Sequence, residues 1–265
     1  MIIAASSTEA ASRRQVNENN ANRLDASGKP TASARTTFIG LDPRQMKGKD
    51  VPHPNALSPM AYRVEEDAGS VLNAHFHKAD QFQIFTKGDG KLGGHPIKSL
   101  CIQFTGAGSA YGPIVAGPGG LDYFTFRNTY TAKAWFMPAS RDELKASPRH
   151  HREVFGDVAA PRSDEELMKA TSVEESHVIE KTDDGLLVWR YLVPPGQSAT
   201  GPAPSSGSGQ FWMVLAGDLE DKDNGPMPKS SCVFVSHDEA AYIAKAGPKG
   251  LDVLVAQFPV KEYQH

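Results

Sequence analysis

Residues Gly69–Gly88 read GSVLNAHFHKADQFQIFTKG. His75 and His77 stand two positions apart, so on a strand both imidazoles point to the same face. Gln81 and Gln83 keep that parity and extend the polar face along the chain. The aromatic and β-branched residues around them favour a β-strand. The stretch therefore predicts one strand region that turns two imidazoles and two amides toward a common interior.

A second copy of this pattern lies 129 to 131 positions further on. Gln81 corresponds to Gln210, each followed by Phe, and Cys101 corresponds to Cys232. The heptapeptide AGPGGLD that ends at position 122 returns as AGPKGLD ending at position 252. Self-similarity at one offset indicates duplicated structure, and a period of this length suits a whole domain. The chain is therefore expected to contain two similar β domains in tandem.

Short apolar runs separated by Gly, Pro, Asp and Ser surround the first copy. Such spacing is typical of antiparallel barrels and sandwiches. The sequence Lys87-Gly-Asp-Gly90 after the run from Gln81 predicts a hairpin turn. The runs expected to form strands are 61–64, 81–86, 100–104 and 123–126.

The spacing of these residues resembles the first motif of the cupin superfamily, G(x)5HxH(x)3E(x)6G. Gly69, His75, His77 and Gly88 match it, and Gln81 stands where the motif has Glu. The resemblance implies an all-β fold of two tandem double-stranded β-helix (cupin, jelly-roll-like) barrels with a few short helices. It identifies the chain as similar to bicupins, with a second barrel that lacks the HxH motif.

In that family the two histidines and the glutamate bind a divalent metal ion. The resemblance therefore implies a site for Fe(II), Mn(II), Ni(II) or Zn(II) made by His75, His77 and Gln81. Tyr111 and His95 are alternative residues for completing the ligand set, since a metal site needs further donors. An amide does not offset the charge of the ion, so glutamine weakens such a site. Because Gln210 persists in the second copy, Gln81 has an alternative role in hydrogen bonding within the barrel.

The second copy has lost both imidazoles. Pro204 and Ser206 replace the two histidines of the first copy, and neither side chain is a good metal ligand at neutral pH. We expect the second barrel to be filled instead by apolar side chains such as Trp212 and Val214.

Two capping-box patterns predict short helices between the two copies. Ser140 with Glu143, and Ser163 with Glu166, have the spacing at which serine and glutamate satisfy each other's backbone donors. The expected divisions are a flexible N-terminal arm over 1–34, a first barrel over 35–137, a linker with short helices over 138–175 and a second barrel over 176–265.

The composition excludes several kinds of partner. The chain of 265 residues has a formal net charge of -3, which predicts no basic face for nucleic acid. It contains no run of 18 apolar residues, so no membrane span is expected. Cys101 and Cys232 form no paired motif, which favours a reducing, cytoplasmic location. Since bicupins resemble pre-formed dimers, we expect a homodimer.

The resemblance suggests a metal-dependent enzyme acting on a small organic substrate. Dioxygenase or other oxygenase chemistry is favoured over a lyase or isomerase reaction, because a two-histidine site leaves positions open for substrate and O2. Tyr111 would then donate or accept a proton, and Gln83 would orient the substrate. The alternative is a non-catalytic bicupin, small-molecule-binding or structural, which the missing carboxylate and the emptied second barrel favour.

Overall fold

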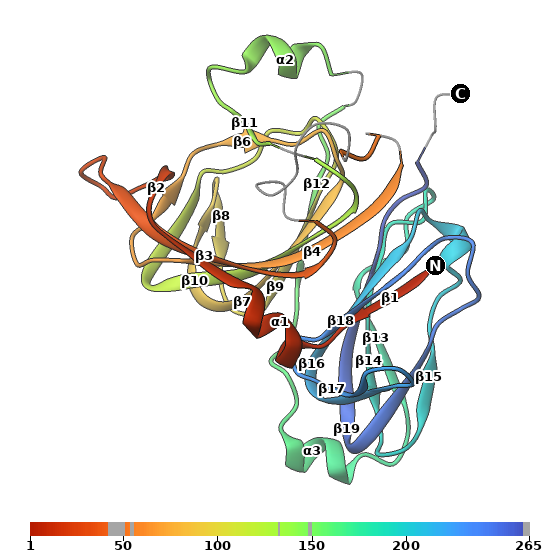
Figure 1. Cartoon of the computed structure of the whole chain (residues 1–265). Helices are drawn as coiled ribbons and strands as arrows, with labels where there is room; N and C mark the ends of the chain where they lie inside the picture. Colours follow the sequence, from red (N-terminus) through yellow and green to blue (C-terminus); the bar gives the residue numbers. More distant parts are fainter. Residues whose placement is uncertain (42–50, 54–55, 132, 148–149, 262–265) are drawn as a thin grey trace. The chain divides into compact units, whose positions relative to one another are not determined.

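The computed structural model of the chain is all-β, as the sequence predicted, and is built from two large antiparallel sheets (Figure 1). It describes residues 1–41, 51–53, 56–131, 133–147 and 150–261. The chain divides into two compact units. We call residues 14–158 the first barrel, and residues 1–13 together with 159–265 the second barrel.

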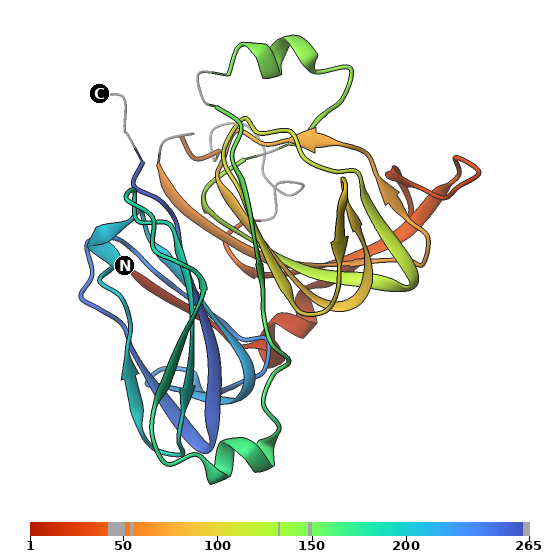
Figure 2. The same ribbon diagram turned by 180° about the vertical axis from the view of Figure 1, so that it is seen from behind.

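The first barrel is a nine-stranded sheet that curves round an interior (Figures 1 and 2). Two short strands form a separate ladder beside it. In sheet order the strands are β12 (Glu153–Asp157), β9 (Cys101–Thr105), β7 (Gln81–Leu92), β10 (Ile114–Thr129), β4 (Leu57–Glu66), β3 (Pro30–Ile39), β2 (Arg14–Leu24) and β5 (Val71–Leu72), with β8 (His95–Ile97) on β7. The separate ladder pairs β6 (His75–Phe76) with β11 (Trp135–Phe136), and α2 spans Arg141–Lys145.

The second barrel is an eight-stranded sheet. Its main order is β1 (Ile2–Ala5), β18 (Cys232–Val235), β16 (Gln210–Asp221), β19 (Ile243–Gln257), β14 (Leu187–Val193) and β13 (Glu174–Ile179), with β15 (Ser198–Thr200) on β19 and β17 (Gly225–Pro228) on β16. The helical segments are α1 (Ser7–Ala10), η1 (Ala11–Arg13), α3 (Asp164–Lys169) and η3 (Pro204–Ser206).

The two sheets repeat one strand order. The run β9-β7-β10-β4 in the first barrel corresponds to β18-β16-β19-β14 in the second. Gln81 and Gln210 are the first residues of β7 and β16. Phe82 pairs with Phe126 in one barrel, and Phe211 pairs with Ala256 in the other. The repeat in the sequence is therefore a repeat of strand pairing, residue by residue.

The prediction of a flexible arm over residues 1–34 is wrong. These residues form β1, α1, η1, β2 and the first part of β3. The chain begins in the second barrel, where β1 pairs with β18, and enters the first barrel at Arg14. β2 escaped detection because its burial pattern is mostly exposed, so it shows no alternation of apolar and polar residues.

The hairpin predicted at Lys87–Gly90 is also wrong. β7 continues through these residues to Leu92, and the turn comes at Gly93. Gly88 has a φ of +81° and marks a shift in the register between β7 and β10. The glycine signal was real, but it belongs to a β-bulge inside a long strand and not to its end.

The region predicted as a linker with two helices does contain α2 and α3. Ser163 makes the complete capping box with Glu166 at the start of α3, whereas Ser140 makes no side-chain cap on α2. The same region also holds β12, a strand that the sequence analysis missed, which pairs with β9 in the first barrel.

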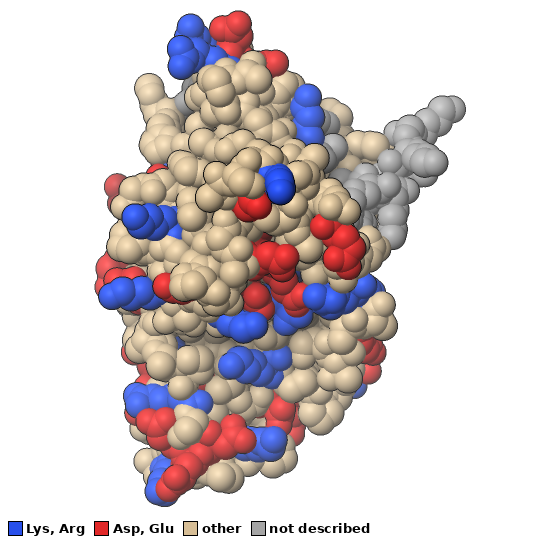
Figure 3. All heavy atoms as spheres, turned by 90° about the vertical axis from the view of Figure 1, so that its left-hand side faces the viewer, with Lys and Arg blue, Asp and Glu red and all other residues tan. Residues whose placement is uncertain are grey.

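The surface carries charges of both signs. Lysine and arginine alternate with aspartate and glutamate over the face drawn in Figure 3, and the described residues on that face form no continuous basic patch. Within the described part of the chain, no helix is long and apolar enough to cross a membrane.

Substituting Gly88 with alanine tests the bulge. A Cβ at Gly88 would lie 2.0 Å from the carbonyl oxygen of Gly120. Gly28 has a similar φ of +80° but no atom within 4 Å of the added Cβ. We expect Gly28→Ala to lower the free energy of unfolding by about 1–2 kcal/mol, the cost of the left-handed backbone alone. Gly88→Ala should cost at least about 1 kcal/mol more, because overpacking adds to it. Equal costs in urea unfolding would contradict this account.

Candidate ligand-binding site

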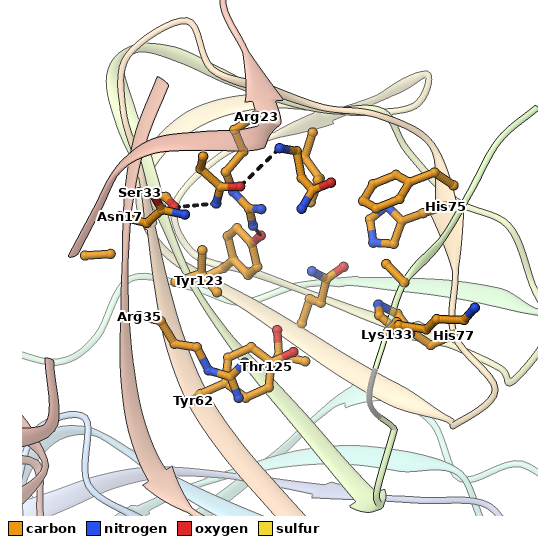
Figure 4. A pocket seen from close by; sticks show the side chains of 18 of the residues that line it. Asn17, Arg23, Ser33, Arg35, Tyr62, His75, His77, Tyr123, Thr125 and Lys133 are labelled. Atoms are coloured by element: carbon orange, nitrogen blue, oxygen red, sulfur yellow. Dashed lines mark hydrogen bonds between the residues drawn. The ribbon is translucent and has the colours of Figure 1, made fainter. Parts of the chain in front are cut away.

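The first barrel contains a partly open cavity of about 410 Å³. β2, β3, β4, β7 and β10 contribute to its wall, together with the segments that carry the two histidines (Figure 4). Its lining includes four cationic side chains, Arg23, Arg35, Arg127 and Lys133. No aspartate or glutamate is among the described residues that line it. The cavity is thus polar, with a marked excess of positive charge on its wall.

His75 and His77 lie side by side at one end of the cavity (Figure 4). Their ring centroids are 5.2 Å apart, and both side chains are buried. The Nδ1 atom of His75 is 2.8 Å from the carbonyl oxygen of Asn73, and that of His77 is 3.0 Å from the carbonyl oxygen of Lys133. Since a carbonyl only accepts, each Nδ1 carries the proton and each Nε2 keeps a lone pair.

Both imidazoles are neutral at physiological pH. Burial, reinforced by the charge of Arg127, lowers the pKa of His75 to about 4. Burial and the same guanidinium also hold the pKa of His77 well below its usual value. The pair therefore presents hydrogen-bond acceptors, not positive charges, to the cavity.

Tyr111 lies against His75. The two residues form an isolated antiparallel bridge, and the phenol hydroxyl of Tyr111 donates to Nε2 of His75 over 2.8 Å. Burial raises the pKa of Tyr111, so the phenol stays protonated and remains the donor in this bond. The structure thus brings together Tyr111 and the two histidines that the sequence singled out.

Gln81 and Arg127 form a second pair deeper in the barrel. Nε and Nη2 of Arg127 donate to Oε1 of Gln81 over 3.2 and 2.9 Å. Both side chains are buried, with exposed fractions of 4% for Arg127 and 1% for Gln81. This supports the alternative role for Gln81, a hydrogen bond within the barrel, because its acceptor oxygen is held by a cation.

Gln83, Thr125 and Tyr62 form a row across three strands. Gln83 pairs with Thr125 between β7 and β10, and Thr125 pairs with Tyr62 between β10 and β4. Arg35 stacks on Tyr62, with its guanidinium carbon 3.7 Å from the ring centroid. Burial alone would raise the pKa of Tyr62, but the charges of Arg127 and Arg35 outweigh it and lower that pKa.

His95 is not part of this group. It lies on β8, and its ring stacks on Phe155 with the centroids 3.9 Å apart. It does not line the cavity that holds His75 and His77. The proposal that His95 completes a metal site with them is therefore wrong, because the hairpin that carries it directs its ring against β12.

The donor set does not fit a divalent metal ion. Within the described part of the chain, no cluster of three or more His, Cys, Asp or Glu side chains is placed to hold one. Nε2 of His75 already accepts the proton of Tyr111, and Oε1 of Gln81 already accepts two from Arg127. A metal would need those same lone pairs and would lie near an uncompensated guanidinium, with no carboxylate to offset its charge.

Arg127 and Arg35 line the cavity but were not among the residues predicted from the sequence. The repeat contained a signal for Arg127, because its equivalent position in the second copy is Gln257. The first copy thus has a charged side chain at a position where the second copy has a neutral amide, which indicates that the charge serves the first barrel alone. Arg35 lies on β3, which the analysis had not identified as a strand.

Comparison with solved structures identifies the fold. Nickel(II)-bound bacterial pirin YhhW from Escherichia coli aligns over 98% of this chain and 100% of its own, at 13% identity and a TM-score of 0.56. The Bacillus subtilis oxalate decarboxylase, studied for its Mn(II) centres, aligns over 98% of this chain and 78% of its own, at 10% identity and a TM-score of 0.52. The chain has the bicupin fold.

This likeness establishes the bicupin architecture and not an activity, since one fold serves many functions. No protein-family model matches the sequence, and no curated protein matches it. The chemistry of this chain therefore has to be argued from its own residues.

The histidine pair predicts a pH dependence of stability. The pKa of His75 is about 4 in the folded chain against 6.5 in the unfolded one. The unfolded chain therefore binds the extra proton between these values, and stability falls as the pH drops through this window, by up to about 1.4 kcal/mol per pH unit. We expect His75→Gln to make the decline in urea-unfolding free energy between pH 6.5 and 4.5 shallower.

His177 supplies the control with the opposite sign. The ring nitrogens of His177 donate to the carboxylates of Glu175 and Glu180, and these hydrogen bonds raise its pKa. Any stability that they add is present at low pH and is lost as the pH rises through the folded pKa. His177→Gln should leave the acid decline in place. If it removes the decline as well as His75→Gln does, the assignment to the buried imidazole is wrong.

Proposed function

We propose that this bicupin binds a small polar organic molecule inside its first barrel. The observation that carries the proposal is the polar cavity of the first barrel, whose wall holds buried polar groups with unused hydrogen-bonding capacity. Oε1 of Gln83 is buried without a hydrogen-bond partner, and Nε2 of His77 makes no hydrogen bond to a described residue. Buried polar atoms without partners are costly, and a ligand that pairs with them removes the cost.

The contrast between the two barrels supports a binding role for the first. Trp212 occupies the position in β16 that Gln83 occupies in β7. Its indole is 1% exposed and stacks on Tyr191, with the ring centroids 5.8 Å apart. Val214 is buried beside it in the same apolar core, as the sequence predicted. One interior is filled by side chains, while the other retains space lined by polar groups.

An enzymatic role within this proposal would rest on Tyr111 and His75. The phenol donates to a neutral imidazole at the cavity wall, and such a pair can pass a proton to or from a bound molecule. Gln83 would orient the molecule through its free acceptor oxygen.

A metal-dependent oxidoreductase of the dioxygenase type is the second candidate. The observation in its favour is that both imidazoles donate Nδ1–H to a backbone carbonyl, as metal-binding histidines do. The similar structures include one with nickel(II) and one with Mn(II) centres. Two hydrogen bonds argue against it. Nε2 of His75 already accepts from Tyr111, and Oε1 of Gln81 already accepts from Arg127.

Filling the cavity tests the binding role. Val64 lines the cavity, whereas Val16 on β2 is 49% exposed and does not. We expect Val64→Phe to abolish the binding of small polar fragments that saturation-transfer NMR detects on the wild-type protein, because the added ring takes their space. Val16→Phe, the same exchange outside the cavity, should keep those fragments. Fragments that still bind to Val64→Phe would refute the proposal.

Metal content decides between the two candidates. We expect less than about 0.1 equivalent of transition metal per chain after native purification, because the donor set lacks a carboxylate. Elemental analysis of the wild type and His77→Ala provides the measurement. About one equivalent in the wild type that disappears in the variant would instead favour the metal-dependent oxidoreductase.

A further inference from the structure

Arg127 is a buried cation without a counter-ion among the described residues. Its recorded hydrogen bonds go to the amide oxygen of Gln81, which is neutral. Arg23, by contrast, is matched by Glu66 at 2.6 Å. Guanidinium stays protonated in proteins, and a buried charge is costly when no opposite charge accompanies it. The neighbourhood of Arg127 therefore favours an anion.

The fold does not require arginine at this position. In the second barrel the equivalent residue is Gln257, and Nε2 of Gln210 donates to its Oε1 over 2.8 Å. Gln257 in turn donates to the carbonyl oxygen of Gly185 over 2.7 Å. An uncharged pair of amides thus satisfies the same strand positions where the interior is filled. Of these two equivalent positions, the one that carries a positive charge, Arg127, lines the cavity of the first barrel.

Gln83 adds a second requirement on the ligand. Its side chain is 3% exposed and lines the cavity, and its Oε1 atom has no hydrogen-bond partner. This oxygen only accepts, so its ligand partner must be a donor such as a hydroxyl group. Gln83 and Gln81 share a face of β7, while Thr125 and Arg127 share a face of the neighbouring β10. The acceptor and the cation therefore border the same part of the interior.

We propose that the first barrel binds a small hydroxylated carboxylate without a metal ion, with the carboxylate on Arg127 and a ligand hydroxyl donating to Oε1 of Gln83. The guanidinium supplies the positive charge that a metal ion would otherwise provide. Arginine suits this role because its planar donors match a carboxylate. The inference rests on the proposed function, since it specifies the class of molecule that the cavity takes.

Three probes separate the requirements. D-Gluconate carries a carboxylate and hydroxyls, sorbitol carries hydroxyls alone, and hexanoate carries a carboxylate alone. Calorimetry on the full chain, dialysed against EDTA, should show D-gluconate binding at least tenfold more tightly than either of the others. Binding that is lost on EDTA treatment, or equal binding of sorbitol, overturns the inference but leaves a ligand-binding cavity. A wild type that binds no D-gluconate overturns it too, while the Val64→Phe comparison judges the cavity separately.

A variant of Arg127, with a matched control, gives a sharper test. Arg127→Gln reproduces the amide pair of the second barrel, so it should fold, and we expect it to weaken D-gluconate binding at least tenfold. Arg14→Gln is the matched control, because Arg14 is 46% exposed, pairs with Glu65 and does not line the cavity. It should bind D-gluconate as the wild type does. Unchanged binding by Arg127→Gln, with its circular dichroism preserved, overturns the proposal.

Gln81→Glu distinguishes a metal-free carboxylate site from a weakened metal centre, because the two predict different results for this variant. A carboxylate at this position would pair with Arg127 and exclude that of the ligand, so D-gluconate binding should fall at least tenfold while the protein stays folded. If the site is instead a weakened metal centre, the same substitution should produce stoichiometric nickel(II) binding, measured by elemental analysis. Retained D-gluconate binding or a gain of nickel(II) contradicts the proposal.

Discussion

The antiparallel pairing of β7 with β10 sets the position of the polar side chains in the cavity. Gln81 and Gln83 come from one strand and Thr125 and Arg127 from the other, and the two-residue period of a strand brings all four to one face. The ladder stays intact across a register shift only because Gly88 leaves room for the carbonyl oxygen of Gly120. A Cβ added at Gly217 would likewise lie 2.0 Å from the carbonyl oxygen of Gly250, so the same constraint applies in the second barrel.

A shared frame with different interiors explains the asymmetry of the chain. Between the copies, Gln83 becomes Trp212 and Thr125 becomes Val255, so a polar row becomes an apolar one. Trp212 also donates through its indole nitrogen to Oε1 of Gln210, which leaves that amide satisfied. The second barrel thus gains packing and loses space. Its interior is a packed apolar core, whereas the first barrel holds the polar cavity.

The two tandem β domains were predictable because the repeat and the short strand runs can be read along the chain. The resemblance of residues 69–88 to the cupin motif supplied the type of barrel. His75, His77, Gln83 and Tyr111 all line one cavity, and strand parity had indicated a common face for the two histidines and Gln83. Sequence reasoning did not find the partner of Gln81, because contact with Arg127 depends on which strands become neighbours. It also assigned His95 to the site on chain proximity alone, although stacking on Phe155 takes the ring elsewhere.

The route of the chain has a consequence for how the protein is made. β1 pairs with β18, so Ile2 lies opposite Val235 although the whole first barrel separates them in the sequence. During synthesis β1 leaves the ribosome before the first barrel and has no partner until β18 has followed. The first barrel is complete long before then and can fold as a unit. Closing so long a loop makes β1 a late addition to the second barrel, which therefore depends on a segment synthesised before the first barrel.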